Sequence, residues 1–214
     1  MFTTISILTK RKAGLSIAHY FTLIRVFISP IFFLLYLEHE NLHISSTILP
    51  YLLLALLGIS ELSDALDGYF ARKFDQVTDL GKILDPMADS IYRISVFLTF
   101  TLPPVRLPMA LVFIFLYRDS IISTLRTVCA LKGVALAARP SGKLKAVIQG
   151  TAALLITLLL IPFSLGALSE ESLQVTSTWI VSIAAIYTLF SGADYLVANR
   201  SYIQKSLAPQ KTGN

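Results

Sequence analysis

SDALDGYFARKFDQVTDLGKILDPMAD (residues 63–89) places acidic side chains where two strongly apolar runs of the chain approach each other. Asp64 and Asp67 are three residues apart near the end of the first run. Asp85 and Asp89 are four residues apart near the start of the second. Residues at these spacings share one face of a helix. If the runs form antiparallel helices joined by a short turn, both pairs can point at one spot.

The composition around this stretch is typical of a membrane protein. The 214 residues are 55% hydrophobic and 14% charged, whereas a soluble domain has about 25% charged residues. The net charge of +5 favours basic cytoplasmic loops in contact with anionic lipid over binding to nucleic acid. We therefore predict an all-α integral membrane protein, with membrane lipid as a partner and no nucleic acid.

Apolar segments of about 20 residues, the length that crosses a bilayer, occur six times along the chain. They cover residues 20–37, 46–66, 83–102, 107–131, 145–165 and 174–197. The predicted architecture is a bundle of six transmembrane helices within residues 20–200. Residues 1–19 form an N-terminal segment, in which 6–18 fit either a short interfacial helix or a plain basic flank. Residues 201–214 form a C-terminal tail.

Lysine and arginine residues are unequally divided between the two sides of this bundle, and such a bias sets orientation in a membrane. One side has Lys10, Arg11, Lys12, Arg72, Lys73, Lys82, Lys132, Arg139, Lys143, Lys145, Arg200, Lys205 and Lys211. The other side has only Arg106. Both termini and the aspartates are therefore predicted to be cytoplasmic. This orientation suits a bacterial inner membrane, although an organelle membrane obeys the same rule.

Four carboxylates close together near hydrocarbon repel one another and are costly to keep ionised. One or two divalent cations remove this cost, and hard oxygen ligands suit Mg²⁺, Mn²⁺ or Ca²⁺ better than zinc. Two such ions a few ångströms apart suit phosphoryl chemistry. We therefore predict a divalent-metal site formed by Asp64, Asp67, Asp85 and Asp89.

Two glycines and an arginine accompany the aspartates. Gly68 directly follows Asp67, and Gly81 lies four residues before Asp85. Glycine at such positions lets a bulky ligand approach the backbone closely. Arg72 lies one helical turn beyond Gly68, and its guanidinium is suited to binding phosphate. Together these residues predict a phosphate-containing ligand at the metal site.

The pattern D-x-x-D-G-x-x-A-R-x(8)-G-x-x-x-D-x-x-x-D resembles the signature of the CDP-alcohol phosphotransferases. It is met in full by Asp64, Asp67, Gly68, Ala71, Arg72, Gly81, Asp85 and Asp89. The likeness extends over most of the chain. It implies an enzyme with two divalent cations, Mg²⁺ (or Mn²⁺), on the four aspartates, with Asp89 also acting as the general base. It also implies a homodimer.

The resemblance further implies the reaction: an alcohol attacks the lipid-bearing phosphorus of CDP-diacylglycerol, and CMP leaves. It assigns nucleotide contacts to Gly68, Arg72 and Thr78, beside Gly81 of the same signature. An N-terminal element that is typical of the family is matched by AHYFTLIR (residues 18–25), with Thr22 and Arg25 at its usual positions.

A second set of cations predicts an acceptor that carries its own phosphate, because a neutral alcohol such as choline or serine would not require them. Arg118 lies inside the fourth span, and Arg126 lies about two turns further on. Lys143 and Lys145 open the fifth span. The alternatives are an ion pair of Arg118 with Asp119 or with a carboxylate of the third span, and a basic membrane flank for the lysines.

Within the family, FTLIRVFISPIFF, FDQVTDLGKILDPMAD, YRDSIISTLRTV and GKLKAVIQ are similar to segments of the branch whose acceptor is sn-glycerol 3-phosphate. Attack there is through the 1-hydroxyl. His19, Ser90 and Thr127 depart from that branch, where Asn, Lys and Glu are usual. Inositol phosphate or serine therefore stays open as an alternative acceptor.

Two other classes of protein are alternatives: a cation transporter that uses the aspartates as its ion site, and a non-catalytic membrane scaffold. The chain has no internal repeat of the kind found in many transporters, and its acids gather near one face. A scaffold would not require four costly carboxylates. Near the end of the sixth span, Asp194 is predicted to pair with an arginine.

Overall fold

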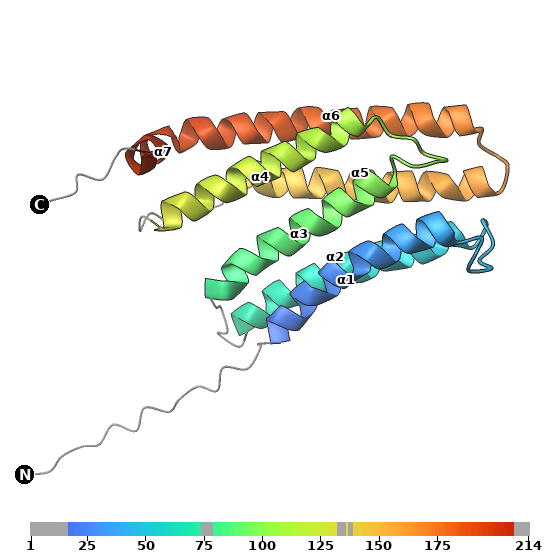
Figure 1. Ribbon diagram of the computed structural model, residues 1–214, viewed down its shortest axis with the longest axis horizontal. Coiled ribbons are helices and arrows are strands. Elements are labelled where there is room, and N and C mark those ends of the chain that lie inside the picture. The colour runs from blue at the N-terminus through green and yellow to red at the C-terminus, as the bar shows by residue number, and fades with distance from the viewer. Residues whose placement is uncertain (1–16, 74–78, 132–135, 137–138, 208–214) are drawn as a thin grey trace, which may run out of the picture.

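The computed structural model describes residues 17–73, 79–131, 136 and 139–207, with side chains for 23–64, 66, 87–131, 136 and 139–204. This part of the chain is all-helical and contains no strand, so the predicted all-α class is confirmed. Figure 1 shows its helices, which are α1 (Ile17–Glu38), α2 (Leu49–Lys73), α3 (Asp79–Thr99), α4 (Met109–Leu131), α5 (Pro140–Ser164), α6 (Glu170–Ala198) and α7 (Arg200–Leu207).

The long helices form two groups that pack against each other. α1 packs against α2 and α3, and α6 packs against α4 and α5. Contacts of α2 with α5, and of α3 with both α4 and α5, join the two groups. Successive helices run in opposite directions (Figure 1). One end of the bundle, here called the aspartate end, therefore holds the end of α2 and the starts of α3 and α5. The other, the loop end, holds the connections 39–48, 100–108 and 165–169.

Each predicted apolar segment corresponds to one long helix, but several helices extend beyond it at the aspartate end. α2 ends at Lys73 rather than 66, α3 begins at Asp79 rather than 83, and α5 begins at Pro140 rather than 145. Apolar composition locates only the part of a helix that is suited to hydrocarbon, whereas the backbone hydrogen bonds continue through polar turns. At α5 the start is set by Pro140, which needs no partner for a backbone N–H in the first turn.

Two terminal predictions differ in outcome. The possible interfacial helix at 6–18 lies almost entirely outside the described residues, because the structure describes the chain only from residue 17. The predicted C-terminal tail contains a short helix, α7, that contacts α4. Its eight residues are too polar to be found by a search for apolar segments.

Among the helices that the structure describes, α5 and α6 are long and apolar enough to cross a membrane. Most of each candidate span is not buried within the protein, and Trp179 and Ile186 on α6 are each 68% exposed. Such large apolar surfaces are unusual on a water-soluble monomer and mark contact with lipid or another chain. In α4 the apolar sequence is interrupted by Arg118, Asp119 and Arg126.

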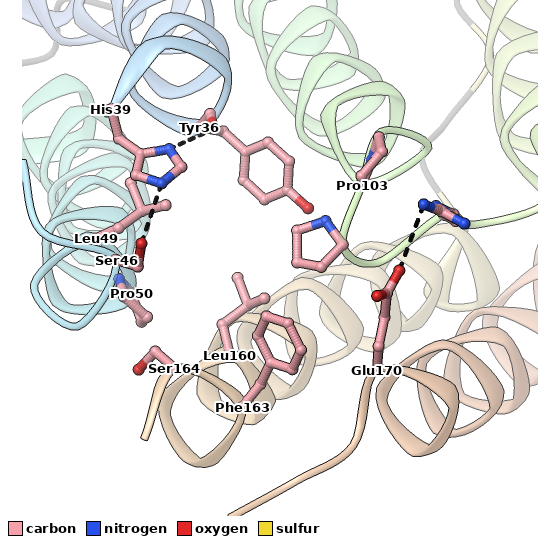
Figure 2. A pocket seen from close by; sticks show the side chains of 12 residues that line it. Tyr36, His39, Ser46, Leu49, Pro50, Pro103, Leu160, Phe163, Ser164 and Glu170 are labelled. Carbon is pink, nitrogen blue, oxygen red and sulfur yellow. Dashed lines mark hydrogen bonds and ion pairs between the residues drawn. The ribbon is translucent and has the colours of Figure 1, made fainter. Parts of the chain in front are cut away.

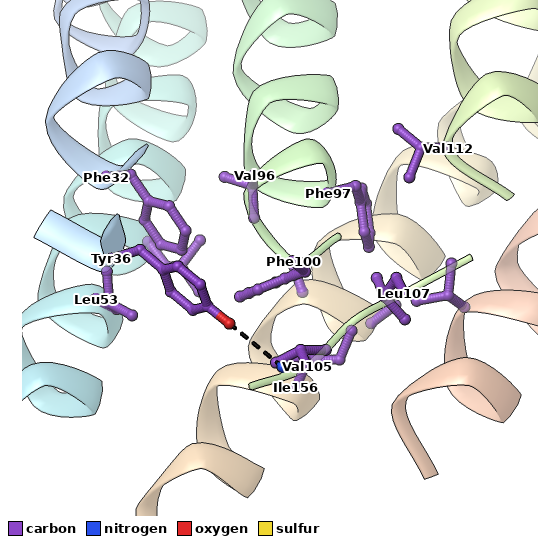
Figure 3. Packing of buried hydrophobic residues seen from close by; sticks show 14 of the residues in the cluster. Phe32, Tyr36, Leu53, Val96, Phe97, Phe100, Val105, Leu107, Val112 and Ile156 are labelled. Carbon is purple, nitrogen blue, oxygen red and sulfur yellow. Dashed lines mark hydrogen bonds between the residues drawn. The ribbon is translucent and has the colours of Figure 1, made fainter. Parts of the chain in front are cut away.

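The hydrophobic core lies toward the loop end and is centred on Phe100, which is fully buried (Figure 3). The Phe100 ring packs edge-on against Phe32 and Tyr36 of α1, with centroid distances of 5.8 and 6.0 Å. The Tyr36 hydroxyl accepts a hydrogen bond from the Val105 backbone N–H at 3.5 Å. These contacts fix α3 and the turn that follows it against α1, and so fix where α3 presents its polar first half.

Replacing Phe100 by alanine should test this core. The substitution removes a fully buried ring, so we expect the free energy of unfolding to fall by about 3–5 kcal/mol. The same change at Phe113 of α4, which is 45% exposed, should cost less than about 1 kcal/mol. Thermal unfolding of both variants in the same detergent measures the difference. Equal losses of stability would contradict this assignment of the core.

Candidate active site

Carboxylates from α2 and α3 converge on one guanidinium group of α1. Arg25 is buried, with 1% of its surface exposed. Its Nη1 donates a hydrogen bond to Asp64 Oδ1 and lies 4.0 Å from Asp89 Oδ1. The Asp64 and Asp89 side chains remain 50% and 29% exposed. Three helices thus place two acidic side chains side by side, where they stay accessible to a ligand.

The other predicted residues of this site lie on the same elements, but their side chains are outside the described residues. On the α2 backbone, Asp67 lies three residues beyond Asp64, and on α3 Asp85 lies four before Asp89, so each pair occupies one helix face. The remaining residues on described backbone are Thr22 on α1, Gly68 and Arg72 on α2, and Gly81 on α3. Thr78 lies wholly outside the described residues.

The described side chains are compatible with a divalent cation. Asp64 and Asp89 supply hard carboxylate oxygens from two helices, the donor type that Mg²⁺ and Mn²⁺ prefer. A positive group, Arg25, already lies between them. No cluster of three or more His, Cys, Asp or Glu side chains occurs in the described part of the chain. That part omits the side chains of Asp67 and Asp85, which helix geometry places one turn from the two that are seen.

A second arginine, which the sequence analysis missed, contacts Asp89 from the same helix. Arg93 Nε donates to Asp89 Oδ1 at 2.9 Å, and Arg93 is 8% exposed. Its Nη1 donates to the backbone carbonyl of Ala146 on α5. The signal available in the sequence was a basic residue four positions after an aspartate inside an apolar span, a spacing that brings side chains together on a helix.

Two of the four cations predicted to bind an acceptor phosphate are joined by one carboxylate. Lys145, which is 5% exposed, places its Nζ 2.8 Å from both carboxylate oxygens of Asp119. Arg118 Nη1 donates to Asp119 Oδ1 at 3.0 Å. Arg118 Nη2 donates to the Ser191 hydroxyl of α6 at 2.8 Å. The cluster therefore holds two positive groups and one negative group, and it keeps a net positive charge.

The other two cations have different surroundings. Arg126 Nε donates to the Tyr195 hydroxyl at 3.2 Å, and its guanidinium lies 5.3 Å from the centre of the same ring. Lys143 is exposed on the first turn of α5. The predicted ion pair of Asp194 with an arginine is confirmed, because Arg139 donates to both of its carboxylate oxygens at 2.8 and 3.0 Å. That pair holds the start of α5 against the end of α6.

The aspartate pair and the acidic–basic cluster are adjacent, because α3 contacts both. Ser90, which directly follows Asp89, donates its hydroxyl hydrogen to Asp119 Oδ2 at 3.4 Å. One turn later, Arg93 contacts Ala146, the neighbour of Lys145. A ligand that bridges the two clusters would therefore place a phosphate on the cations and a second group beside the Asp89 carboxylate.

The predicted site residues do not line the cavity at the loop end (Figure 2). This cavity has a volume of about 300 Å³. Its wall is largely apolar, with Leu49, Leu160 and Phe163 facing inward and an ion pair between Arg106 and Glu170 at 3.5 Å along its edge. It contains no aspartate, and the predicted site residues lie at the opposite end of the bundle.

Comparison with known proteins relates most of the chain to one enzyme family. A family model described as CDP-alcohol phosphatidyltransferase matches residues 15–190. The chain is 31% identical, over 86% of its length and 95% of the relative, to the CDP-diacylglycerol–glycerol-3-phosphate 3-phosphatidyltransferase of Bacillus subtilis. It is 28% identical, over 87% of its length and 98% of the relative, to the protein of that name from Rickettsia typhi. A shorter similarity, 38% over 32% of each chain, is to a cardiolipin synthase (CMP-forming) of Streptomyces coelicolor.

Substituting Asp119 by asparagine should reveal the cations that it neutralises. Lys145 would lose its charge partner in a buried position, which lowers the free energy of unfolding by about 3–5 kcal/mol when the pair is fully buried. The freed cations should also bind inorganic phosphate more tightly. We therefore expect a lower melting temperature without phosphate and a larger rise on adding it than in the wild type. The exposed Glu171 is the control, and its change to glutamine should alter neither. A D119N variant with the wild-type phosphate response would contradict this arrangement.

Proposed function

The chain belongs to the CDP-alcohol phosphatidyltransferase family, and from this premise we propose that it transfers the phosphatidyl group from CDP-diacylglycerol to sn-glycerol 3-phosphate. The products are phosphatidylglycerophosphate and CMP, in the biosynthesis of phospholipids. The observation that carries the choice of acceptor is the Arg118–Asp119–Lys145 cluster beside Asp89, with its net positive charge. It suits an alcohol that carries a phosphate, and relatives that align over most of this chain bear the corresponding name.

In this proposal two divalent cations, Mg²⁺ or Mn²⁺, bind the carboxylates of Asp64, Asp67, Asp85 and Asp89. When bound, such ions neutralise the diphosphate and stabilise the charge of the departing CMP. The convergence of Asp64 and Asp89 on a single guanidinium supports this placement, since it shows that α2 and α3 direct carboxylates to one point.

Asp89 is proposed as the general base. Its carboxylate takes the proton of the 1-hydroxyl of glycerol 3-phosphate while that oxygen forms a bond to the lipid-bearing phosphorus. The bond between this phosphorus and the oxygen of CMP breaks, and CMP leaves with the electron pair. Asp89 suits this role because its side chain is 29% exposed and lies next to the cationic cluster through Ser90.

The substrates are proposed to bind on either side of α3. The acceptor phosphate binds to Arg118, Arg126, Lys143 and Lys145, whose side chains come from α4 and α5. CDP-diacylglycerol binds at the meeting of α1, α2 and α3, through Thr22, Gly68, Arg72, Thr78 and Gly81. Support for the second placement comes from the helix ends, because the end of α2 and the start of α3 lie at the aspartate end of the bundle (Figure 1).

We also propose that α1 to α6 all cross the membrane, in a bacterial inner membrane, with both termini and the active site on the cytoplasmic side, and that the enzyme is a homodimer. The regular alternation of helix direction (Figure 1) and the surplus of basic residues at one end support this topology. α5 and α6 meet the requirements of a membrane span by themselves. The homodimer rests on family resemblance alone.

The topology can be tested with single cysteines, because the native Cys129 is buried. Ser45 lies in the connection between α1 and α2, Ser201 lies on α7, and both are exposed. A membrane-impermeant maleimide should label the Ser45→Cys variant in intact spheroplasts and the Ser201→Cys variant only after the membrane is opened. Labelling of both variants in intact spheroplasts, or the reverse pattern, would contradict the proposed orientation.

The proposed reaction can be tested by CMP release from CDP-diacylglycerol and Mg²⁺ by the purified protein. One acceptor is supplied per reaction: glycerol 3-phosphate, inositol 1-phosphate, inositol, serine or phosphatidylglycerol. We expect release with glycerol 3-phosphate and not with the others. Release with only one of the other acceptors would support phosphotransfer but show that glycerol 3-phosphate is not the acceptor. If the protein releases no CMP but conducts divalent cations, its assignment as an enzyme would be wrong.

The role of Asp89 predicts that its change to asparagine lowers the rate constant by about 100- to 10,000-fold, the usual contribution of a general base. Gel filtration and the melting temperature should show a folded protein. The Glu40→Gln variant, altered in an exposed position of the loop end, is the matched control and should turn over like the wild type. A D89N variant with wild-type activity would show that Asp89 is not the general base.

A further inference from the structure

We propose that Arg93 is a positioning residue that fixes the Asp89 carboxylate relative to α5, and thereby relative to the acceptor. This inference rests on the proposed function and deepens it, because it adds a residue outside the family signature quoted above. Arg93 would not touch either substrate. It would act through Asp89, by holding one oxygen of the carboxylate and directing the other.

The contacts of Asp89 support this division between its two oxygens. Arg93 Nε lies 2.9 Å from Oδ1, and Arg25 Nη1 lies 4.0 Å from the same oxygen. Among the contacts between described residues, those of the Asp89 side chain go to Oδ1. Oδ2 is thus the oxygen that these protein contacts leave for a bound cation and for the hydroxyl of the acceptor.

Arg93 also connects Asp89 to the helix that carries the acceptor cations. While its Nε binds Asp89, its Nη1 donates to the carbonyl of Ala146, one residue after Lys145. A guanidinium can donate in two directions from one rigid plane, whereas an ammonium group is a single point of charge. The distance between the carboxylate of α3 and the first turns of α5 is therefore set by a rigid group rather than by a flexible chain.

The surroundings of Arg93 are shaped to hold it. It is 8% exposed, and a buried charge at this depth requires compensation. Gly150 of α5 leaves the space that the guanidinium fills, because a Cβ atom there would lie 3.3 Å from Arg93 Nη1. The same Cβ would lie 3.4 Å from Glu61 Oε1, so this glycine leaves room for the ends of both side chains. The Asp89 carboxylate of α3 and the backbone of α5 thus hold one guanidinium in place.

A purely structural role for Arg93 makes a different prediction. A buried ion pair that only joins helices would, when removed, reduce the amount of folded protein and leave the folded fraction fully active. A positioning role would lower the rate constant of the folded protein. It would also change how the carboxylates bind a cation, because Asp89 would lose a positive neighbour.

The test compares Arg93→Met and Arg93→Lys with the wild type and with Arg106→Gln, which removes an exposed arginine at the loop end. For the folded Arg93→Met protein we expect kcat to fall by about 100-fold, the effect of misplacing a reacting group by about 1 Å. Arg93→Lys keeps the charge and loses the second bond, so its kcat should fall by roughly tenfold. The KM for CDP-diacylglycerol should stay near the wild-type value.

Mn²⁺ binding, followed by electron paramagnetic resonance without substrates, gives a readout that is independent of turnover. Removal of the positive charge beside Asp89 should tighten Mn²⁺ binding by roughly threefold or more in Arg93→Met. Arg93→Lys should bind Mn²⁺ like the wild type. Wild-type kcat and Mn²⁺ affinity in Arg93→Met would overturn the proposal, and so would a loss of activity that disappears when rates are scaled to folded protein.

Gly150→Ala keeps the test decisive if Arg93→Met does not fold. Its methyl group would press on the guanidinium at 3.3 Å, and we expect kcat to fall by roughly threefold to tenfold. Gly58→Ala is the matched control, because a Cβ at that position meets nothing within 4 Å. Wild-type kcat in Gly150→Ala would then overturn the proposal.

Failure of the proposed function would look different. If the wild-type protein uses another acceptor, the variants are assayed with that acceptor. If the wild-type protein releases no CMP, the proposed function is wrong, but the Mn²⁺ measurements still report on the pairing of Arg93 with Asp89.

Discussion

Charge compensation around Asp64 and Asp89 is the constraint on which the rest of the structure depends. Carboxylates inside a helix bundle are costly unless positive groups lie close to them. Arg25 of α1 and Arg93 of α3 meet this requirement. Arg25 contacts both aspartates, and Arg93 contacts Asp89 and the backbone of α5. The same contacts therefore stabilise the acidic site and determine how α1, α2, α3 and α5 are placed around it.

α3 carries both the site and the core, and one stripe along it explains how. Asp89, Arg93 and Val96 of α3, and Phe100 directly after its last residue, follow one another at helical spacing, so they face the interior of the bundle together. The first two make ion pairs and polar contacts, and the last two are buried among apolar side chains (Figure 3). Because Phe100 is fixed against α1 at the loop end, the carboxylate of Asp89 is carried on a rigid support, as a reacting group requires.

The acidic–basic cluster of Arg118, Asp119 and Lys145 is a second example of charge compensation in the bundle. Asp119 holds Lys145 and Arg118 together, so neither cation is buried alone. One negative charge against two positive charges leaves a surplus that an anionic acceptor can meet. Asp119 and Arg93 thus have related effects: each fixes a charged partner in place, and each links α3 or α4 to α5.

The sequence by itself determined the helices and the aspartate spacing, because both follow from local regularities: apolar length for the helices, and three- and four-residue intervals for shared faces. It also predicted that Asp194 pairs with an arginine, and the structure identifies that arginine as Arg139. Helix ends were misplaced where polar turns extend α2, α3 and α5, and α7 was missed for its polarity. Only the tertiary structure decided that Arg93 binds the Ala146 carbonyl, 53 residues away, and that Lys145 pairs with Asp119, 26 residues away. Such contacts depend on how the helices cross and which side chains the crossing brings together, and no local interval in the chain records that.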